Sequence, residues 1–361
     1  MSIGIKTLGA LLFAATLIGS SASAAAPLLI DSIKAKSPTG GAELRFPKLA
    51  GNGANFRAIN LYLFAVELQQ RPARDAKAAL ILPKDGSLSE LDYEVIGDTG
   101  RVLSIRVSGK RSGLGFSHLH NFDVASGLPI LLADLFTPEG YGRLRTQVAT
   151  PRVQRIRDFQ QTLNPKDDLQ SEQREVYEDC LPAVRGDTLT DNQLLLAIDH
   201  LALERPDCTT QDQLELDVLR PLKVKLPLTV LAPDLGPYGR CALLPAESSA
   251  PACALPPKQG LRLGSYAGTI DKEKINLVIE RLYDGDRVDA SWSREADGRY
   301  HRLQGRVQRD GKAKLFETEA GSEALLVEFT LFGKADGSFA GQWRTVTGGS
   351  ALKPLELKVL Q

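Results

Sequence analysis

Hydrophobic and polar residues alternate with a period of two through most of the last hundred residues. Steps such as Asp297-Gly298, Asp310-Gly311 and Asp336-Gly337 interrupt this alternation. Short alternating segments separated by such turns predict sequential antiparallel strands. The expected strands are residues 264–270, 274–281, 287–293, 302–308, 313–317, 325–332, 338–345 and 355–360. Closing them on themselves would remove the exposed edges, so residues 259–361 are expected to form an all-β antiparallel meander or small barrel.

The preceding part of the chain mixes the period of two with a helical period near 3.6. Asn55 stands before apolar residues on one helical face and is the expected N-cap of a helix. Thr137 and Pro138 are the expected cap and first turn of a second helix, which runs to about Leu163, and a charged loop is expected around Pro165. The expected strands are residues 28–33, 43–46, 91–95, 101–107, 116–124, 194–203, 214–219 and 222–228. Residues 25–238 therefore predict an α+β domain with an antiparallel sheet and helices, followed by a Pro- and Cys-rich linker at 239–258.

The first residues have the pattern of a secretory signal peptide. Lys6 precedes an uncharged apolar stretch from Leu8 to Ile18, and the small residues Ala22-Ser23-Ala24 follow. The stretch is shorter than the roughly 20 residues that a spanning helix needs. We therefore expect a signal peptide over residues 1–24, a mature chain that is periplasmic or secreted, and no membrane insertion after cleavage.

The balance of charged residues bears on whether the protein binds nucleic acid. Lys plus Arg and Asp plus Glu each number 44, so the formal net charge is zero. A neutral chain has no long-range attraction to the phosphates of nucleic acid, and no nucleic-acid partner is expected.

The four cysteines are Cys180, Cys208, Cys241 and Cys253. In an oxidising compartment an even number favours disulfides, and four cysteines allow three connectivities. We expect Cys180–Cys208 and Cys241–Cys253, because each pair closes a segment rich in Pro, Asp and Thr. A zinc site is the alternative, but no two cysteines have the short spacing of metal ligands. No metal and no cofactor are predicted.

One segment resembles a known family. His120-Asn121-Phe122-Asp123 turns at Gly127 and is followed by Asp134-Leu135-Phe136. This signature resembles a domain of unknown function that is shared by the extracytoplasmic lysozyme-sensing part of a bacterial anti-sigma factor and by the accessory domain of some peptidoglycan deacetylases. The resemblance covers about residues 28–238, and residues 259–361 resemble a small glycine- and aromatic-rich envelope β-domain. It implies recognition of peptidoglycan or of a lysozyme-like protein. In physical terms, Asp123 and Asp134 are expected to accept backbone N–H bonds in a turn and at a helix start.

Two further groups of residues are candidates for a metal site and for an aromatic binding surface. His118 and His120 share a face of a strand and would need a third ligand to bind a metal, which the sequence does not place. Solvated polar positions explain the pair equally well. Trp292 and Trp343 would form an aromatic platform for a glycan or peptide if exposed, and packing in the core is the alternative.

These observations favour a non-enzymatic envelope protein that binds or senses peptidoglycan or a wall-acting enzyme. The alternative is an envelope glycan or peptidoglycan hydrolase whose catalytic carboxylates the sequence does not reveal, and no catalytic residue is assigned. A cleft with two facing carboxylates of perturbed pKa would favour the hydrolase, and a smooth groove or an open aromatic face would favour binding. The expected binding surface is the densest acidic stretch, placed in the charged loop: Asp167, Asp168, Glu172, Glu175, Glu178 and Asp179.

Overall fold

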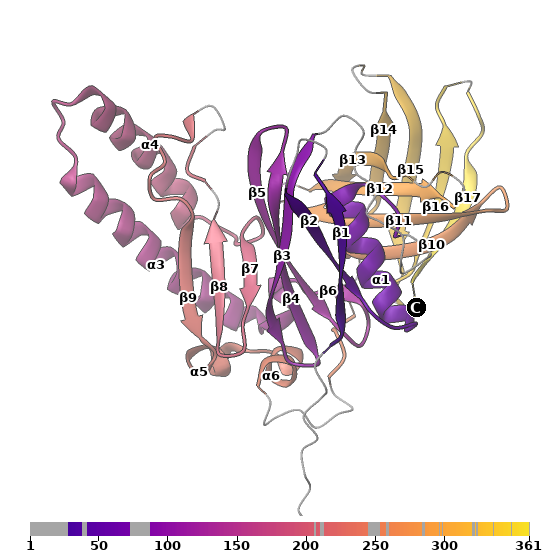
Figure 1. Cartoon of the computed structure of the whole chain (residues 1–361), viewed down its shortest axis with the longest axis horizontal. Coiled ribbons are helices and arrows are strands. Elements are labelled where there is room, and N and C mark those ends of the chain that lie inside the picture. The colour runs from indigo at the N-terminus through magenta and orange to yellow at the C-terminus, as the bar shows by residue number, and fades with distance from the viewer. Residues whose placement is uncertain are drawn as a thin grey trace, which may run out of the picture.

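A computed structural model describes residues 28–37, 42–72, 87–205, 207–209, 213–244, 253–257, 260–283, 286–295, 297, 299–319, 322, 324–334, 336–347 and 349–360. The signal-peptide prediction lies outside these residues. The described residues form three open antiparallel sheets and a closed barrel, with a long helical hairpin at the end away from the barrel (Figure 1).

The first sheet pairs β1 (Ile30–Lys36) with β2 (Glu43–Leu49). The second sheet has the order β3-β4-β5-β6 and is a meander. Its strands are β3 (Leu88–Asp98), β4 (Val102–Arg111), β5 (Leu114–Asp123) and β6 (Leu128–Pro129). Helix α1 (Ala54–Leu63) continues as the π-helix η1 (Phe64–Leu68) and lies between these strands and the barrel (Figure 1). Apolar residues of β2, α1, η1 and β4 form one core there, among them Phe46, Ile59 and Ile105.

The third sheet pairs β7 (Gln193–Leu196), β8 (His200–Arg205) and β9 (Leu222–Pro227). The short helix α2 (Leu132–Leu135) and the hairpin of α3 (Pro138–Thr162) and α4 (Asp168–Arg185) precede it in the chain. After β9 come α5 (Leu228–Leu231), the 3-10 helix η3 (Ala232–Asp234) and α6 (Pro237–Leu243). Leu144 and Val148 of α3 pack with leucines of β7 and β8 in a second core.

The C-terminal part is a closed barrel with the strand order β10 to β17, as the alternating pattern predicts. Its strands are β10 (Gly264–Ile270), β11 (Glu273–Leu282), β12 (Arg287–Arg294), β13 (His301–Val307), β14 (Ala313–Thr318), β15 (Leu325–Gly333), β16 (Phe339–Thr345) and β17 (Lys353–Val359). Inward residues such as Leu277, Leu315 and Phe329 are fully buried and fill the interior. The barrel prediction is confirmed.

Hydrogen bonds join the barrel to α1 and η1. The Tyr62 hydroxyl donates to the backbone oxygen of Glu280 over 2.9 Å, and the Ser265 hydroxyl donates to that of Ala58 over 3.1 Å. The Tyr300 amide donates to the backbone oxygen of Gln69 over 3.1 Å. The barrel is thus docked on the helix through specific polar contacts as well as apolar packing.

Several local predictions in the first part are wrong. Gly53, not Asn55, is the N-cap of α1, because the Asn55 amide instead donates to the Val124 carbonyl over 2.6 Å. The described residues of 214–219 form turns and not a strand, and residues 194–203 bend into two strands. The loop expected around Pro165 is short, because helix α4 begins at Asp168.

Candidate functional site

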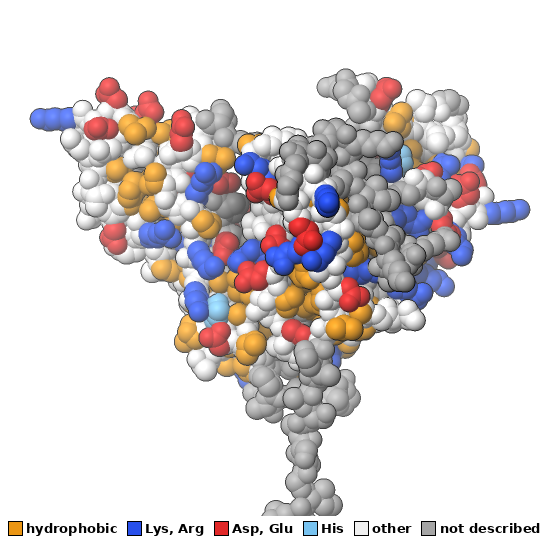
Figure 2. Space-filling model, in the orientation of Figure 1, with side chains coloured by type: hydrophobic (Ala, Val, Ile, Leu, Met, Phe, Trp, Pro, Cys, Tyr) orange, Lys and Arg blue, Asp and Glu red, His pale blue; other side chains and the backbone are white. Residues whose placement is uncertain are grey.

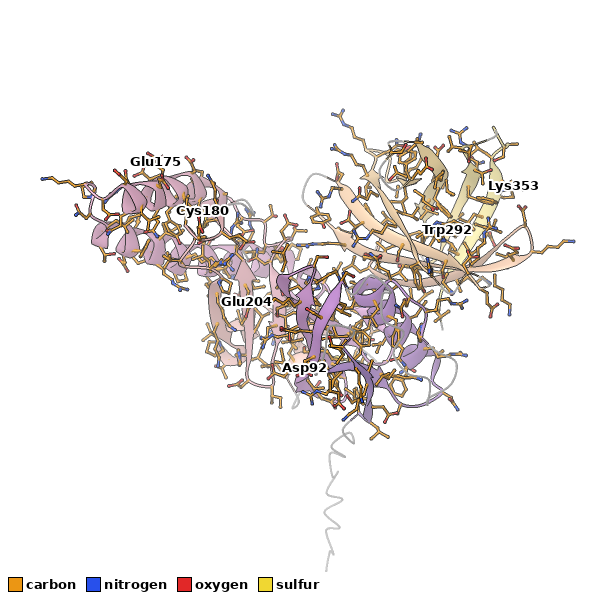
Figure 3. The ribbon with its side chains drawn as sticks, turned by 45° about the horizontal axis from the view of Figure 1, so that its top comes forward. Asp92, Glu175, Cys180, Glu204, Trp292 and Lys353 are labelled. Carbon is orange, nitrogen blue, oxygen red and sulfur yellow. A yellow bond between two sulfur atoms is a disulfide. The ribbon has the colours of Figure 1, made fainter. Side chains whose placement is uncertain are left out.

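The six acidic residues expected in a loop belong to α4 and its cap. Asp167 is the N-cap and accepts the Gln170 amide over 3.0 Å, and the other five lie within the helix. Gln173, Tyr177, Cys180 and Val184 form the buried side of α4. The acids lie away from that stripe and are exposed: Asp168, Glu172, Glu175, Glu178 and Asp179. The structure therefore gathers them on one rigid surface, which we call the acidic face of α4; Figure 3 shows Glu175 on it.

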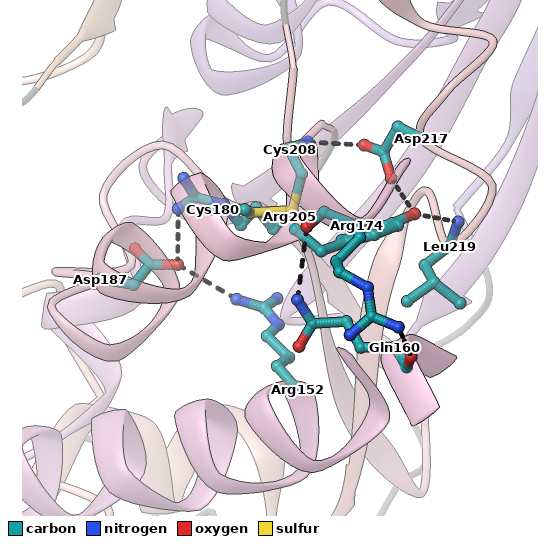
Figure 4. The surroundings of a disulfide bond; sticks show 10 residues. Arg152, Gln160, Arg174, Cys180, Asp187, Arg205, Cys208, Asp217 and Leu219 are labelled. Carbon is teal, nitrogen blue, oxygen red and sulfur yellow. Dashed lines mark hydrogen bonds and ion pairs between the residues drawn. A yellow bond between two sulfur atoms is a disulfide. The ribbon is translucent and has the colours of Figure 1, made fainter. Parts of the chain in front are cut away.

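A disulfide fixes the hairpin to the body of the protein. Cys180 of α4 is bonded to Cys208, which follows β8, and Cys241 is bonded to Cys253. Both predicted pairs are confirmed. Beside the first disulfide, Asp217 accepts the Cys208 amide over 2.6 Å (Figure 4). Asp217 also accepts the Tyr177 hydroxyl over 2.8 Å. The covalent bond and the buried carboxylate together hold α4 against the segment before β9.

A buried arginine braces the other helix of the hairpin. Arg152 of α3 is 1% exposed and lies 3.1 Å from Asp187, which also pairs with Arg205 over 3.2 Å (Figure 4). Its guanidinium also donates to the Leu203 carbonyl over 2.9 Å. Burial lowers the pKa of Arg152 to about 10, which still leaves it charged at neutral pH. Breaking such a buried pair is expensive, so α3 has a fixed position on the sheet.

Replacing both Cys180 and Cys208 with alanine is expected to destabilise the protein by about 3 kcal/mol, because the bond closes a loop of 28 residues. Replacing Cys241 and Cys253, which are 12 residues apart, should cost slightly less. Urea unfolding of the two variants measures both losses. Equal stability of the first variant and the wild type would contradict the bracing role.

The signature segment has the structural tasks expected of it. Asp123 accepts the Ser126 amide over 2.9 Å within the turn, and Asp134 accepts the Leu131 amide over 2.9 Å at the start of α2. Asp134 also pairs with buried Arg262 over 2.8 Å. Gly127 has a φ of +73°, and a Cβ there would lie 2.5 Å from the Asn55 carbonyl, so this turn requires glycine.

The remaining signature residues join sheets and helices. Asn121 bridges two sheets, since its amide donates to the Leu194 carbonyl over 2.6 Å. Phe122 and Leu135 are fully buried, and Phe136 forms an isolated bridge with Leu235. The segment therefore connects the second sheet, the third sheet and the helices after β9.

Trp292 and Trp343 do not form an exposed platform. They are 3% and 4% exposed and belong to the barrel core. The Trp292 ring N–H donates to Glu317 over 2.8 Å. Inward-facing aromatic residues fill the interior of a small barrel, so the core alternative holds for both.

The two histidines of β5 meet a carboxylate that the sequence did not place. Glu67 of η1 is 1% exposed, and its Oε1 lies 2.6 Å from His120 Nε2 and 3.0 Å from His118 Nδ1. Burial alone would raise the pKa of Glu67, but the hydrogen bonds from His118 and His120 outweigh it and lower that pKa to about 2. An ionised carboxylate only accepts, so both facing ring nitrogens carry hydrogens.

This arrangement does not resemble a metal site. The imidazole nitrogens that face Glu67 carry hydrogens and donate to it, so they have no free lone pair with which to bind a metal ion. Among the residues that the structure describes, no set of three or more His, Cys, Asp or Glu side chains is arranged to hold a metal ion. His120 is buried, so the alternative of two solvated polar positions applies only to half-exposed His118.

A second carboxylate with a perturbed pKa, that of Glu280, lies on barrel strand β11 where the barrel contacts α1. Glu280 is skipped where the pairing of β11 with β12 shifts register between Ile279 and Arg281, so it occupies a β-bulge. Burial raises the pKa of Glu280 to about 7, with Asp289 and Glu67 adding to the rise and Ser291 and Arg302 opposing it. The hydroxyl groups of Ser291, Ser293 and Tyr300 are buried close to Glu280, so this part of the contact between the barrel and η1 is polar.

Replacing Glu280 with glutamine is expected to flatten the pH dependence of stability. The folded pKa is raised from 4.5, so the stabilising contribution is complete below about pH 4.5 and is lost as the pH rises through about 7. The wild type should lose about 2 kcal/mol more than E280Q between about pH 5 and about pH 8. Urea unfolding across this range measures the difference, and parallel profiles would show that Glu280 does not titrate there.

Comparison of the chain with family models, with curated proteins and with solved structures found no match in any of the three. The resemblance of the signature segment therefore stays a prediction. None of the described helices is long and apolar enough to cross a membrane. The two disulfides fit a protein that folds outside the reducing cytoplasm.

Proposed function

We propose that this protein is a cell-envelope binding protein that recognises a basic, lysozyme-like wall enzyme through the acidic face of α4, without chemically changing it. The observation that carries the proposal is the rigid display of unpaired carboxylates on a helix that extends away from the core. The family resemblance and the expected export to the periplasm supply the class of partner.

Three acidic side chains of α4 have no ion-pair partner among the described residues. Glu172, Glu175 and Asp179 form no ion pair with any described side chain, and they recur three or four positions apart on the helix. Like charges at this spacing destabilise a helix by about 0.2–0.5 kcal/mol per pair. The sequence tolerates this cost, which favours a role for the charges outside the folded chain.

On the first and second sheets, unlike on α4, several exposed charged side chains form ion pairs with one another. Lys34 pairs with Glu43, Arg45 with Asp92, and Arg106 with Glu94. Figure 2 shows these strands crossed by a band of adjacent basic and acidic side chains, whereas acidic side chains lie along the outer edge of the hairpin. Paired charges cancel, so the acidic face of α4 has the stronger local field for a cationic partner.

Calorimetric titration of the full chain with a basic lysozyme tests the proposal. We expect micromolar or tighter binding that weakens steeply when salt is raised, because exposed charges are screened. Mass spectrometry should recover both proteins unchanged. Absence of binding at micromolar concentration, or binding that salt does not weaken, would contradict the proposal.

A second candidate is an envelope glycan hydrolase, and its one support is that the pKa values of Glu67 and Glu280, about 2 and about 7, are separated as in a base and an acid. The binding role is preferred, because Glu67 is 1% exposed and its carboxylate already accepts hydrogen bonds from His118 and His120. Incubation of purified wall glycan with the wild type, E67Q and E280Q tests it. Glycan cleavage by the wild type that both substitutions abolish would establish the hydrolase and displace the binding role.

A further inference from the structure

A shallow hollow of about 570 Å³ runs along the outer side of α3. Its charged lining consists of Arg145 and Arg157 of α3 and Arg185 from the last turn of α4, and its described lining residues include no carboxylate. The acidic face belongs to the other helix of the hairpin. The hairpin therefore separates its charges, with the basic groups concentrated around this hollow.

Two of the three guanidinium groups form no ion pair with the described residues. Arg145 donates to the carbonyl oxygens of Asp187 and Gly186, which fixes it at the end of α4. Arg157 and Arg185 form no ion pair with any residue in the described part of the chain. Unneutralised guanidinium groups are well suited to bind carboxylate or phosphate oxygens in a planar, two-pronged geometry.

The hollow has charge at both ends and a neutral middle. Arg145 and Arg157 are separated by about 18 Å along α3, at the usual rise of an α-helix. Arg185 lies at the Arg145 end, because Arg145 binds the residue next to it. Between the ends lie Ala149 and Val153, with the hydroxyls of Thr146 and Thr150. A matching ligand is extended and bears acidic groups more than one sugar apart, with hydroxyls and small apolar faces between them.

We propose that this hollow binds a linear glycan strand that carries carboxylates, as in the wall polymer on which a lysozyme-like enzyme acts. The choice of polymer rests on the proposed envelope function, but the site does not involve the acidic face of α4. The guanidinium groups bind carboxylates at the two ends, and the threonine hydroxyls and small apolar side chains contact the sugars between. The neutral net charge argues against a nucleic acid, because no long-range field supplements the hollow.

The test is the affinity of the full chain for soluble, uncrosslinked peptidoglycan strands with free stem-peptide carboxylates. The double variant Arg157→Gln/Arg185→Gln should bind about 30-fold more weakly than the wild type. Arg155→Gln/Arg306→Gln removes two exposed arginines outside the hollow and should bind like the wild type. Strands whose carboxylates have been amidated should lose affinity for the wild type to a similar degree.

Three outcomes would overturn the inference: no binding of the strands, equal loss in both double variants, or binding unaffected by amidation. Inorganic polyphosphate is the competing source of anions, and tighter arginine-dependent binding of it than of the strands would also overturn the glycan assignment. The Arg157→Gln/Arg185→Gln variant should still bind lysozyme like the wild type. Failure of the glycan site is thereby distinguished from failure of the acidic face.

Discussion

Replacing Glu67 with alanine is expected to destabilise the protein by about 4 kcal/mol at neutral pH. The substitution leaves buried His120 without the acceptor of its 2.6 Å hydrogen bond and removes a carboxylate that also faces His118. Leaving a buried donor without its acceptor costs about 1–3 kcal/mol, and the cavity left by truncating a buried side chain adds a cost of similar size. Urea unfolding monitored by circular dichroism measures the loss.

The pH dependence of this loss gives a second readout. The pKa of Glu67 is depressed from 4.5, so its contribution is present above about pH 4.5 and is lost as the pH falls towards 2. The gap between the wild type and E67A should therefore narrow in acid. Glu94→Ala is the control, because Glu94 forms an exposed ion pair with Arg106, and it should change stability by less than about 1 kcal/mol. Similar effects of the two substitutions would refute the role of Glu67.

Neutralising the acidic face of α4 is expected to weaken lysozyme binding by about 100-fold without destabilising the protein. The variant is Glu172→Gln/Glu175→Gln/Asp179→Asn. Removing charges that face a cationic partner costs affinity, and removing like-charge repulsion within α4 should raise helix stability by a few tenths of a kcal/mol. Calorimetry and thermal unfolding measure the two effects separately.

The matched control removes three acids from the charge band on the sheets. Glu90→Gln/Asp92→Asn/Glu94→Gln changes net charge by the same amount, and these residues pair with Lys110, Arg45 and Arg106. It should retain lysozyme affinity within a few-fold. If both triple variants bind equally weakly, the attraction depends on net charge and not on α4.

The barrel could be predicted from the sequence because its strands are neighbours along the chain and its turns are local. The expected strand 264–270 coincides with β10, and the expected strand 287–293 ends one residue short of β12. Helix α4 was missed because its buried stripe contains Gln173, Tyr177 and Cys180, which give a weak hydrophobic pattern. Its acids were assigned to a loop, whereas they lie in the helix and at its N-cap.

The cluster of Glu67 with His118 and His120 could not be predicted from the sequence, because its members are far apart along the chain. Glu67 and His120 are 53 positions apart, and only the packing of η1 on β5 brings them together. A single acid within the apolar run Leu61 to Leu68 was the one local signal. The sequence left both an aromatic platform and core packing open for Trp292 and Trp343, because a period of two does not show which face of a closing sheet becomes the interior.

Carbodiimide labelling of carboxylates, with and without bound lysozyme, tests the central claim most directly. Each labelled residue is identified by peptide mass spectrometry. We predict that lysozyme protects Glu172, Glu175 and Asp179, while exposed Glu94 and Glu356 are labelled equally in both states. Unchanged labelling of α4, or protection located on the barrel, would contradict the assignment of α4 as the binding surface.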